Sequence, residues 1–440
     1  MPTQPESPPR RLRVAVAGLG TVGHSVIRLL QEDSARLHRQ IGTELDLTTV
    51  FDRSHKTKEI SWLPPSARLT DSVEEFLANP ADIVVELIGG EQPADRIIRD
   101  CLGRKRAVVT ANKQLMAAHG ASYLALAESN RAYLGFEGSV AGGIPILRTL
   151  RRSLLADRIV SIRGILNGTC NFILSEMAES RREQADVLAE AQALGFAEAD
   201  PMLDVSGRDT ADKLVILAAL AFGRWARPDQ LAMRGITELD RVDFLYAKRL
   251  GASLRMLGVA QRRDGPISMW VSPCLVDDRL TLSTISGVLN AVEITGARLG
   301  ATLFSGPGAG GNPTAVSVVG DILNAARWSQ GETVFTAPRA EDPGSSADAQ
   351  DYAPRDRLPF YLRFFVEDRP GIIARLAQIL ANHEINIDSV LQESWTERER
   401  LPFVISVDPT LHATIEMAVA EMNALDFVLT PPLVLPILRN

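Results

Sequence analysis

The sequence predicts an α/β protein with three folded regions, and three observations indicate this organisation. At 440 residues, the chain is long enough for about three domains. Short apolar runs alternate with amphipathic segments over the first third of the chain, which is typical of a doubly wound parallel sheet. A stretch rich in Pro, Ser and Gly then separates the middle of the chain from a C-terminal segment with its own strand and helix pattern.

The first region begins with an apolar run at 12–18, followed by a glycine-rich turn and an amphipathic segment at 22–32. A second apolar run ends at Phe51 and completes a βαβ unit. The alternation continues with a helix-like stretch at 93–102 and apolar runs near Ile83, Val108 and Leu134. We therefore expect residues 12–137 to form a parallel sheet with helices on both faces.

Between residues 138 and 327 the pattern mixes strands with Ala- and Leu-rich helical segments, which predicts an α+β domain. The pattern leaves open whether the helical segment 306–327 returns to the first domain. Residues 328–357 lack apolar periodicity, so we interpret them as a linker. Residues 358–440 follow the order strand, helix, strand, strand, helix, strand, which predicts a ferredoxin-like plait.

Composition and charge argue against several classes of function. The formal net charge of -7 is spread along the chain without a basic stripe, so nucleic acid is not an expected partner. The three cysteines lie far apart, which predicts reduced thiols in a cytoplasmic protein without a zinc site. Residues 1–11 lack the apolar core of a secretory signal and are interpreted as a disordered tail. No apolar run is long enough for a membrane span, so no membrane association is expected.

A glycine motif lies between the first predicted strand and the first predicted helix. Gly18, Gly20 and Gly23 form G-x-G-x-x-G in the context that the motif requires. The three glycines allow, in order, a tight turn, the approach of the backbone to a pyrophosphate and close packing of the helix on the strand. We expect a dinucleotide here, with further contacts from Thr21 and Val22.

The end of the second strand normally selects the cofactor. Asp52 suits the ribose 2′-hydroxyl of NAD, whereas Arg53 and Lys56 suit the 2′-phosphate of NADP. Both signals are present, so the sequence leaves the choice between NADP and NAD open.

The most specific stretch runs from Ala191 to Lys213. Its Ala, Gly, Asp-Pro, Asp, Gly, Asp and Lys residues stand at the spacing of the homoserine dehydrogenase signature, which this stretch strongly resembles. Further segments agree in order: GLGTVG, VVELIGG, VVTANK, EGSVAGGIPI, LNGTCNFIL and GPGAGGNPTA. The resemblance covers residues 12 to 327. It implies a Rossmann-type NAD(P) domain, a catalytic and dimerisation domain, and the reversible interconversion of L-homoserine and L-aspartate 4-semialdehyde.

Oxidation of a primary alcohol needs a hydride acceptor and a group that takes the proton. No histidine lies in these motifs, so Lys213 and Lys113 are the leading candidates, and the sequence does not rank them. Asp209 stands four residues before Lys213, where a helix would make them either a catalytic pair or an ordinary surface ion pair. The resemblance implies that Lys213 transfers the proton and that Asp209 and Glu198 contact the substrate. Asp204 is a further candidate for the substrate ammonium.

Other site residues follow from the resemblance. Lys113 is expected at the carboxyl edge of the sheet, near nicotinamide and substrate. Gly195 and Gly310 are expected to line the cofactor pocket, although a need for positive φ would also explain both glycines.

A glycine-rich turn begins at Glu137 and offers oxygen ligands of the kind that alkali cations accept. The resemblance implies a sodium or potassium ion held by Glu137 and by the backbone carbonyls of Val140, Gly142 and Ile144. A plain tight turn is the alternative.

The C-terminal segment carries Asp368-Arg-Pro-Gly371 before its first helix and Asn386 at its second strand, and it resembles an ACT domain. Exposed amides at Gly371 can hold a ligand carboxylate. The resemblance implies a homodimer or homotetramer and feedback inhibition, with threonine the expected effector near these residues. A purely structural dimerisation plait is the alternative.

We expect a monofunctional enzyme on the shared route to threonine, isoleucine and methionine, because no kinase-like segment precedes the first strand. Two other hypotheses compete with it. One is a different NAD(P) enzyme of similar architecture, against which the signature argues. The other is a non-catalytic amino-acid sensor, against which the intact glycines and lysines argue.

Overall fold

The structure is a computed structural model that describes residues 10–197, 200–262, 265–332, 352–393 and 400–439. The chain divides into two compact units. Unit 1 comprises Met1–Asp157, Val215–Arg227 and Gly306–Ala347, and unit 2 comprises Arg158–Leu214, Pro228–Ser305 and Asp348–Asn440. Most of the expected N-terminal tail and of the expected linker lies outside the described residues.

Unit 1 is built on a six-stranded sheet in the order β3-β2-β1-β4-β5-β6, with every neighbouring pair parallel. The strands are β1 (Arg10–Ala17), β2 (Thr43–Phe51), β3 (Arg68–Thr70), β4 (Ile83–Glu86), β5 (Ala107–Thr110) and β6 (Leu134–Gly135). This order is that of a doubly wound sheet, so the predicted fold class is confirmed. Strand β1 begins at Arg10, inside the expected tail, because Arg10 pairs with Thr43 of β2.

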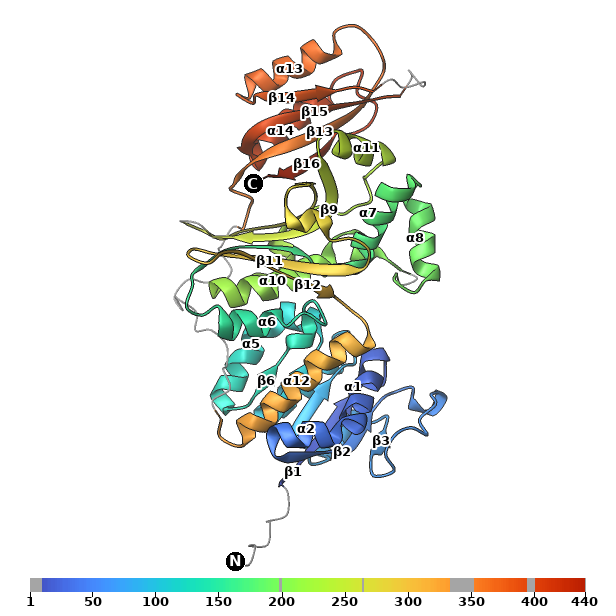
Figure 1. The fold of residues 1–440 in the computed structure, drawn as a ribbon, viewed down its shortest axis with the longest axis vertical. Helices are drawn as coiled ribbons and strands as arrows, with labels where there is room; N and C mark the ends of the chain where they lie inside the picture. The colour runs from blue at the N-terminus through green and yellow to red at the C-terminus, as the bar shows by residue number, and fades with distance from the viewer. Residues whose placement is uncertain (1–9, 198–199, 263–264, 333–351, 394–399, 440) are drawn as a thin grey trace, which may run out of the picture. The chain divides into compact units, whose positions relative to one another are not determined.

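The helices of unit 1 cover its sheet. They are α1 (Thr21–Glu32), α2 (Ser34–Ile41), α3 (Val73–Ala78), α4 (Ala94–Gly103), α5 (Lys113–Asn130), α6 (Ile146–Arg148) and α12 (Gly311–Ser329), with short turns η1 (His55–Thr57), η2 (Glu137–Ser139) and η3 (Thr149–Ser153). Although α12 is distant in sequence, it lies beside α1 (Figure 1). Its residues Val318 and Ile322 share one core with Val14 and Val16 of β1. Helix α12 therefore completes the first sheet domain.

Unit 2 contains a ten-stranded sheet with the path β12-β11-β7-β9-β10-β16-β13-β15-β14, and β8 pairs with β10. Its middle region comprises β7 (Ile159–Ile165), β8 (Ala232–Met233), β9 (Ala252–Gln261), β10 (Ser268–Asp277), β11 (Leu289–Gly296) and β12 (Gly300–Pro307). The helices are α7 (Gly168–Ser180), α8 (Gln184–Ala193), α9 (Met202–Val205), α10 (Arg208–Phe222) and α11 (Arg241–Arg249), with turns η4 (Pro228–Gln230) and η5 (Thr281–Thr284). The residues of α10 from Val215 onward belong to unit 1. This mixture of strands and helices agrees with the predicted α+β region.

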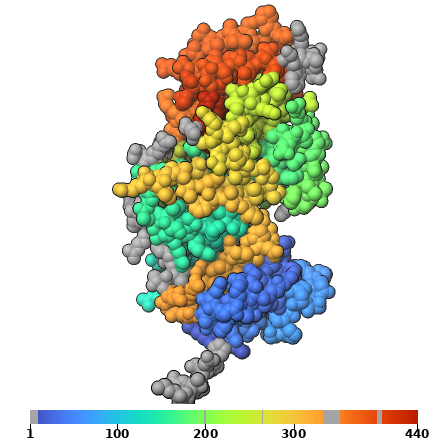
Figure 2. Space-filling model, viewed as in Figure 1, coloured from blue at the N-terminus to red at the C-terminus, as the bar shows by residue number. Residues whose placement is uncertain are grey.

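The C-terminal module has the predicted βαββαβ order. It comprises β13 (Arg357–Val366), α13 (Ile372–Asn382), β14 (Ile387–Leu391), β15 (Leu401–Leu411), α14 (His412–Asn423) and β16 (Leu433–Leu438). Strand β16 also pairs in parallel with β10, where Leu275 is opposite Ile437. The C-terminal sheet therefore continues the middle sheet, and Figure 2 shows the two sets of residues packed together. The sequence did not predict this continuity.

A buried ion pair also joins the C-terminal module to α11. The Asp243 carboxylate accepts hydrogen bonds from Arg363 Nε at 2.9 Å and from Tyr361 Oη at 2.7 Å. Arg363 also donates to the Glu238 carbonyl at 2.8 Å. Asp243 has no exposed surface, and this burial raises the pKa of its carboxyl despite the neighbouring guanidinium.

No helix among the described residues has both the length and the apolar character needed to cross a membrane.

Candidate functional site

The glycine motif forms the turn between β1 and α1. Gly18 has φ +111°, and a Cβ atom there would lie 2.6 Å from the Leu87 carbonyl oxygen. A Cβ atom at Gly23 would lie 1.9 Å from the Gly18 carbonyl oxygen, so only glycine fits either position. Gly20 begins α1 without a side-chain cap and with open space around it. The first amides of α1 are therefore suited to an anionic group such as a pyrophosphate.

The start of α12 lies at the same turn. Gly310 precedes α12 with φ +114°. A Cβ atom on Gly311 would lie 2.5 Å from Ser25 Oγ and 3.1 Å from the carbonyl oxygen of Thr21. Gly310 therefore lies beside the first turn of α1, which begins with Thr21 and Val22. Its positive φ also explains the glycine, so both sequence interpretations of Gly310 are compatible with the geometry.

Asp52, at the end of β2, is 8% exposed and points back into the turn. Its Oδ2 accepts hydrogen bonds from Leu19 N at 2.8 Å and Lys58 Nζ at 2.7 Å, and its Oδ1 accepts from Ser54. Burial alone would raise the pKa of Asp52, but these hydrogen bonds prevail and lower it to about 2. Oδ2 thus stabilises the glycine turn and Oδ1 the loop after β2, whereas the neighbouring Arg53 is exposed.

Lys113 is the first residue of α5 and follows β5 at the carboxyl edge of the sheet. Asn112 fixes this helix start, because its side chain accepts from Leu115 N and donates to the Gly90 carbonyl at 2.8 Å. Glu86, at the same edge, is fully buried and accepts a hydrogen bond from Thr110 Oγ1 at 2.6 Å. Burial raises the pKa of Glu86. The helix start places Lys113 where ligands of open α/β sheets bind.

Lys213 and Asp209 lie one turn apart on α10 and are 7% and 4% exposed. Lys213 Nζ donates to Asp209 Oδ2 at 2.7 Å and to the Leu166 carbonyl at 2.6 Å. Lysine is almost never buried unless it is paired. The alternative of an ordinary surface ion pair is therefore inconsistent with the burial of these two side chains.

Two asparagines complete this cluster, and sequence reasoning did not single them out. Asn167 Nδ2 donates to Asp209 Oδ2 at 2.8 Å and to Asp204 Oδ1 at 2.7 Å, while its Oδ1 accepts from Cys170 N and caps α7. Asn290 Nδ2 donates to the Leu166 carbonyl at 2.9 Å. Asn167 could have been recognised as a helix cap in the LNGTCNFIL segment. Nothing in the sequence indicates Asn290.

The cluster contains one ammonium and two carboxylates: Asp209 contacts Lys213 directly, and Asp204 is joined to Asp209 through Asn167. The structure brings together Asp204, Asp209 and Lys213, as the signature implies. An excess of negative charge suits a cationic amine in a substrate. Glu198 lies outside the described residues. Gly195 follows α8 with φ +76°, so its backbone conformation accounts for the glycine.

The turn after Glu137 is buried in unit 1. The Glu137 carboxylate accepts from Leu147 N at 2.9 Å and Arg148 N at 2.8 Å, so it caps α6. Burial and the negative charge of Asp321 raise the pKa of Glu137 to about 7. The Arg148 guanidinium, 3.3 Å from Asp321 Oδ1, offsets part of this negative charge. The two neighbouring carboxylates still favour a further cation.

The three expected carbonyl ligands belong to the same turn. The Gly142 oxygen accepts from Ser317 Oγ at 2.6 Å, and the Ile144 oxygen accepts from Ile146 N at 2.7 Å. A carbonyl oxygen has a second lone pair, so these bonds do not prevent a cation contact. The side chains of Val140 and Ile144 are buried and apolar. These two residues can therefore contact a cation only through their backbone carbonyl oxygens. No cluster of three or more His, Cys, Asp or Glu side chains suited to a metal occurs within the described ranges.

Two of the expected effector residues, Asp368 and Gly371, lie in the turn before α13, and the third, Asn386, directly precedes β14. Gly371 begins this helix with φ +93°, no side-chain cap and open space around it. Asp368 and Asn386 are also exposed. The amides at Gly371 are thus accessible to a carboxylate, and their ligand stays a prediction.

Three family models match the chain. They are described as the NAD-binding domain of homoserine dehydrogenase over residues 18–137, homoserine dehydrogenase over 145–323, and the ACT domain over 360–424.

Named relatives agree over almost the whole chain. A homoserine dehydrogenase from Neisseria gonorrhoeae is 37% identical over 423 residues, which cover 96% of this chain and 97% of the relative. One from Bacillus subtilis is 36% identical, with 95% and 96% covered.

Solved structures show the same likeness. The homoserine dehydrogenase from Thiobacillus denitrificans has a TM-score of 0.87 at 36% identity and covers 97% of this chain and 98% of its own. A hyperthermophilic archaeal homoserine dehydrogenase in complex with NADPH has a TM-score of 0.63 at 27% identity, with 74% and 99% covered.

Proposed function

The chain belongs to the homoserine dehydrogenase family, and from that premise we propose that it oxidises L-homoserine reversibly to L-aspartate 4-semialdehyde with a nicotinamide dinucleotide. The buried Lys213–Asp209 pair inside the family signature carries this proposal. We assign the reaction to cytoplasmic biosynthesis of threonine, isoleucine and methionine.

Lys213 accepts the proton of the substrate hydroxyl and returns it in the reverse reaction. The dinucleotide, when bound, supplies the hydride acceptor. Asp209 and the Leu166 carbonyl orient the Lys213 amine through the hydrogen bonds described above. Lysine suits this role because its amine can exchange a proton, whereas an arginine guanidinium stays charged.

Asp204 and Asp209 bind the substrate ammonium. Asn167 holds one oxygen of each carboxylate, which fixes their positions relative to each other. Glu198 contributes a further carboxylate, by likeness to the family signature. Lys113, at the carboxyl edge of the other sheet, positions the reacting oxygen.

NADP is the preferred cofactor. Both oxygens of Asp52 already accept hydrogen bonds, Oδ2 from Leu19 N and Lys58 Nζ and Oδ1 from Ser54, so the ribose 2′-hydroxyl of NAD would compete with these donors. The exposed Arg53 would contact a 2′-phosphate. The archaeal relative in complex with NADPH supports this preference.

Glu137 and the carbonyls of Val140, Gly142 and Ile144 bind sodium or potassium. Their gathering in one buried turn, beside a second carboxylate, supports a bound cation. Threonine inhibits the enzyme through the C-terminal module, near Asp368, Gly371 and Asn386, in a homodimer or homotetramer.

The first experiment measures absorbance at the reduced-nicotinamide band with L-homoserine and either NAD⁺ or NADP⁺. We expect homoserine-dependent reduction with a lower KM for NADP⁺. Arg53→Ala should raise the KM for NADP⁺ about tenfold and leave that for NAD⁺ nearly unchanged, because the loss of one charge-assisted contact costs about 1.5 kcal/mol. Arg39→Ala removes the same charge from an exposed position in the last turn of α2 and serves as the matched surface control, with neither KM expected to change.

Three additions to this assay test the remaining proposals. Replacement of potassium and sodium by tetramethylammonium should lower the rate, and threonine should inhibit it. Threonine binding by folded protein without any nicotinamide reduction would contradict the enzyme and favour the sensor. Reduction with other hydroxy amino acids but not with homoserine would favour a different dehydrogenase.

A further inference from the structure

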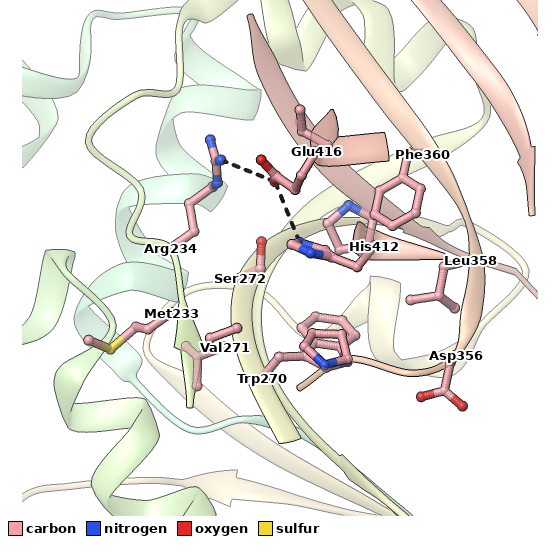
Figure 3. Close-up of a pocket in the computed structure, with 14 residues that line it drawn as sticks. Met233, Arg234, Trp270, Val271, Ser272, Asp356, Leu358, Phe360, His412 and Glu416 are labelled. Atoms are coloured by element: carbon pink, nitrogen blue, oxygen red, sulfur yellow. Dashed lines mark ion pairs between the residues drawn. The ribbon is translucent and has the colours of Figure 1, made fainter. Parts of the chain in front are cut away.

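A cavity of about 230 Å³ lies within unit 2, where the C-terminal module meets the middle sheet (Figure 3). We call it the joint cavity. Strands β8 and β10 contribute Met233, Trp270 and Val271, while β13 and α14 contribute Phe360, His412 and Glu416. Ligand pockets for drug-sized molecules begin at about 300 Å³. The smaller volume suits a ligand of the size of an amino acid.

One side of the joint cavity is charged. The Glu416 carboxylate lies 3.9 Å from Arg234 and 3.6 Å from His412 Nε2, as the dashed lines in Figure 3 show. Both separations exceed a hydrogen bond. Burial lowers the pKa of His412, so its ring is mainly neutral at pH 7 and offers one donor and one acceptor. Arg234 Nη1 also makes a direct ion pair with Glu238 at 2.7 Å, so its Nη2 is the part of the guanidinium that faces Glu416. The gaps between Glu416 and its two neighbours can admit a charged head group.

The opposite side of the cavity is mainly apolar, although the Asp356 carboxylate also lines it (Figure 3). Trp270, Val271 and Phe360 are 4%, 1% and 1% exposed. Trp270 Nε1 is a buried donor with no hydrogen-bond partner among the described residues. A buried donor without a partner is uncommon in a folded protein.

We propose that the joint cavity binds a small zwitterionic amino acid with an apolar side chain. Glu416 binds its ammonium, Arg234 binds its carboxylate, and Trp270 and Phe360 contact its side chain. This site is separate from the turn at Asp368 and Gly371, whose residues do not line the cavity. The joint cavity would be a second ligand site beside the one proposed for threonine. Binding there does not depend on the proposed reaction, whereas an effect of the ligand on catalysis rests on the proposed function.

The walls of the joint cavity touch the start of the catalytic helix. A Cβ atom on Gly207 would lie 3.1 Å from Val271 Cγ1 and 3.4 Å from Met233 Cγ, and both side chains line the cavity. Gly207 has φ +88° and immediately precedes α10, which carries Asp209 and Lys213. A ligand that moves Met233 or Val271 therefore acts on the backbone that positions the catalytic pair.

The test is isothermal titration calorimetry on the full chain with L-threonine, L-valine, L-isoleucine and L-methionine in turn. We expect at least one of them to bind the unsubstituted protein. Glu416→Gln and Arg234→Gln should each weaken binding about tenfold or more, because each removes a charge-assisted contact. Glu421→Gln, on the same helix but paired with His383, should leave the dissociation constant unchanged.

Hydrogen exchange tests the link to α10. The bound amino acid should slow exchange in peptides that cover 205–213, and unchanged exchange there would overturn the coupling. No binding by any of the four amino acids would overturn the site. Loss of binding in Asp368→Asn but not in Glu416→Gln would also overturn it, because the ligand would then sit at the turn before α13. Binding without homoserine-dependent reduction would support the amino-acid site and contradict the proposed reaction. The two proposals can therefore be refuted independently.

Discussion

Among the described residues of unit 2, two ion pairs have both partners buried, Lys213 with Asp209 and Arg363 with Asp243. Their burial is similar, at 7% and 4% exposure in the first pair and 5% and 0% in the second. Their cations differ in chemistry: a lysine amine can exchange its proton, whereas a guanidinium stays charged and donates from a rigid fork. We therefore assign the first pair to proton transfer and the second to holding the C-terminal module on α11. Burial alone does not separate a catalytic pair from a structural one.

The largest expected effect is on turnover at the first pair. Lys213→Ala should lower kcat by about 10²–10⁴-fold, the usual contribution of a general acid or base. Dinucleotide binding, followed by fluorescence titration, should survive because Lys213 is not part of the glycine turn. A kcat near that of the unsubstituted enzyme would remove Lys213 from the mechanism.

Substitution in the second pair should lower the free energy of unfolding. Asp243→Asn leaves the buried Arg363 charge uncompensated, which should cost about 3–5 kcal/mol of unfolding free energy. Guanidinium chloride denaturation followed by circular dichroism measures this loss. Asp426→Asn breaks the exposed pair with Arg369 and serves as the control, with little change expected. Equal stability of the two variants would show that the buried pair does not hold the module.

A smaller loss of unfolding free energy should follow from Arg363→Lys, which keeps the positive charge but not the planar guanidinium with its several donors. One of the bonds to Asp243 and the Glu238 carbonyl would be lost, at about 1–2 kcal/mol. The same denaturation experiment applies. A variant as unstable as Asp243→Asn would mean that geometry, rather than charge, dominates this pair.

A loss of similar size, and one that depends on pH, concerns the more exposed pair of Asp52 and Lys58 in unit 1. Because folding lowers the pKa of Asp52 to about 2, its contribution is present above about pH 4 and is lost as the pH falls toward 2. Asp52→Asn should cost about 1–2 kcal/mol near pH 6, and the difference from the unsubstituted protein should shrink from about pH 5 to about pH 3. A constant difference across this range would exclude the carboxylate charge as its cause.

The two buried pairs also show what could be predicted from the sequence. Asp209 and Lys213 stand four residues apart within one helix, so their contact follows from helical geometry. Asp243 and Arg363 are 120 residues apart and lie on different elements, α11 and β13, so no local pattern predicts their contact. The doubly wound sheet and the βαββαβ module were predictable because each has a local pattern of strands and helices.

Partners that come from distant segments were not predictable in the same way. Asn290 reaches the Leu166 carbonyl across 124 residues and belongs to no motif. Asp52 looked like a cofactor ligand because of its position at a strand end, yet its oxygens are bonded to Leu19, Ser54 and Lys58. Tertiary hydrogen bonds of this kind leave no periodic signal in the sequence.

The most direct test of the account is the kcat of Lys213→Arg for homoserine oxidation at saturating NADP⁺. Arginine retains the positive charge beside Asp209 but cannot release a proton near neutral pH. The account predicts a folded protein whose kcat falls about as far as that of Lys213→Ala. A kcat within a few-fold of the unsubstituted enzyme would show that this position needs only a charge, and it would contradict proton transfer by Lys213.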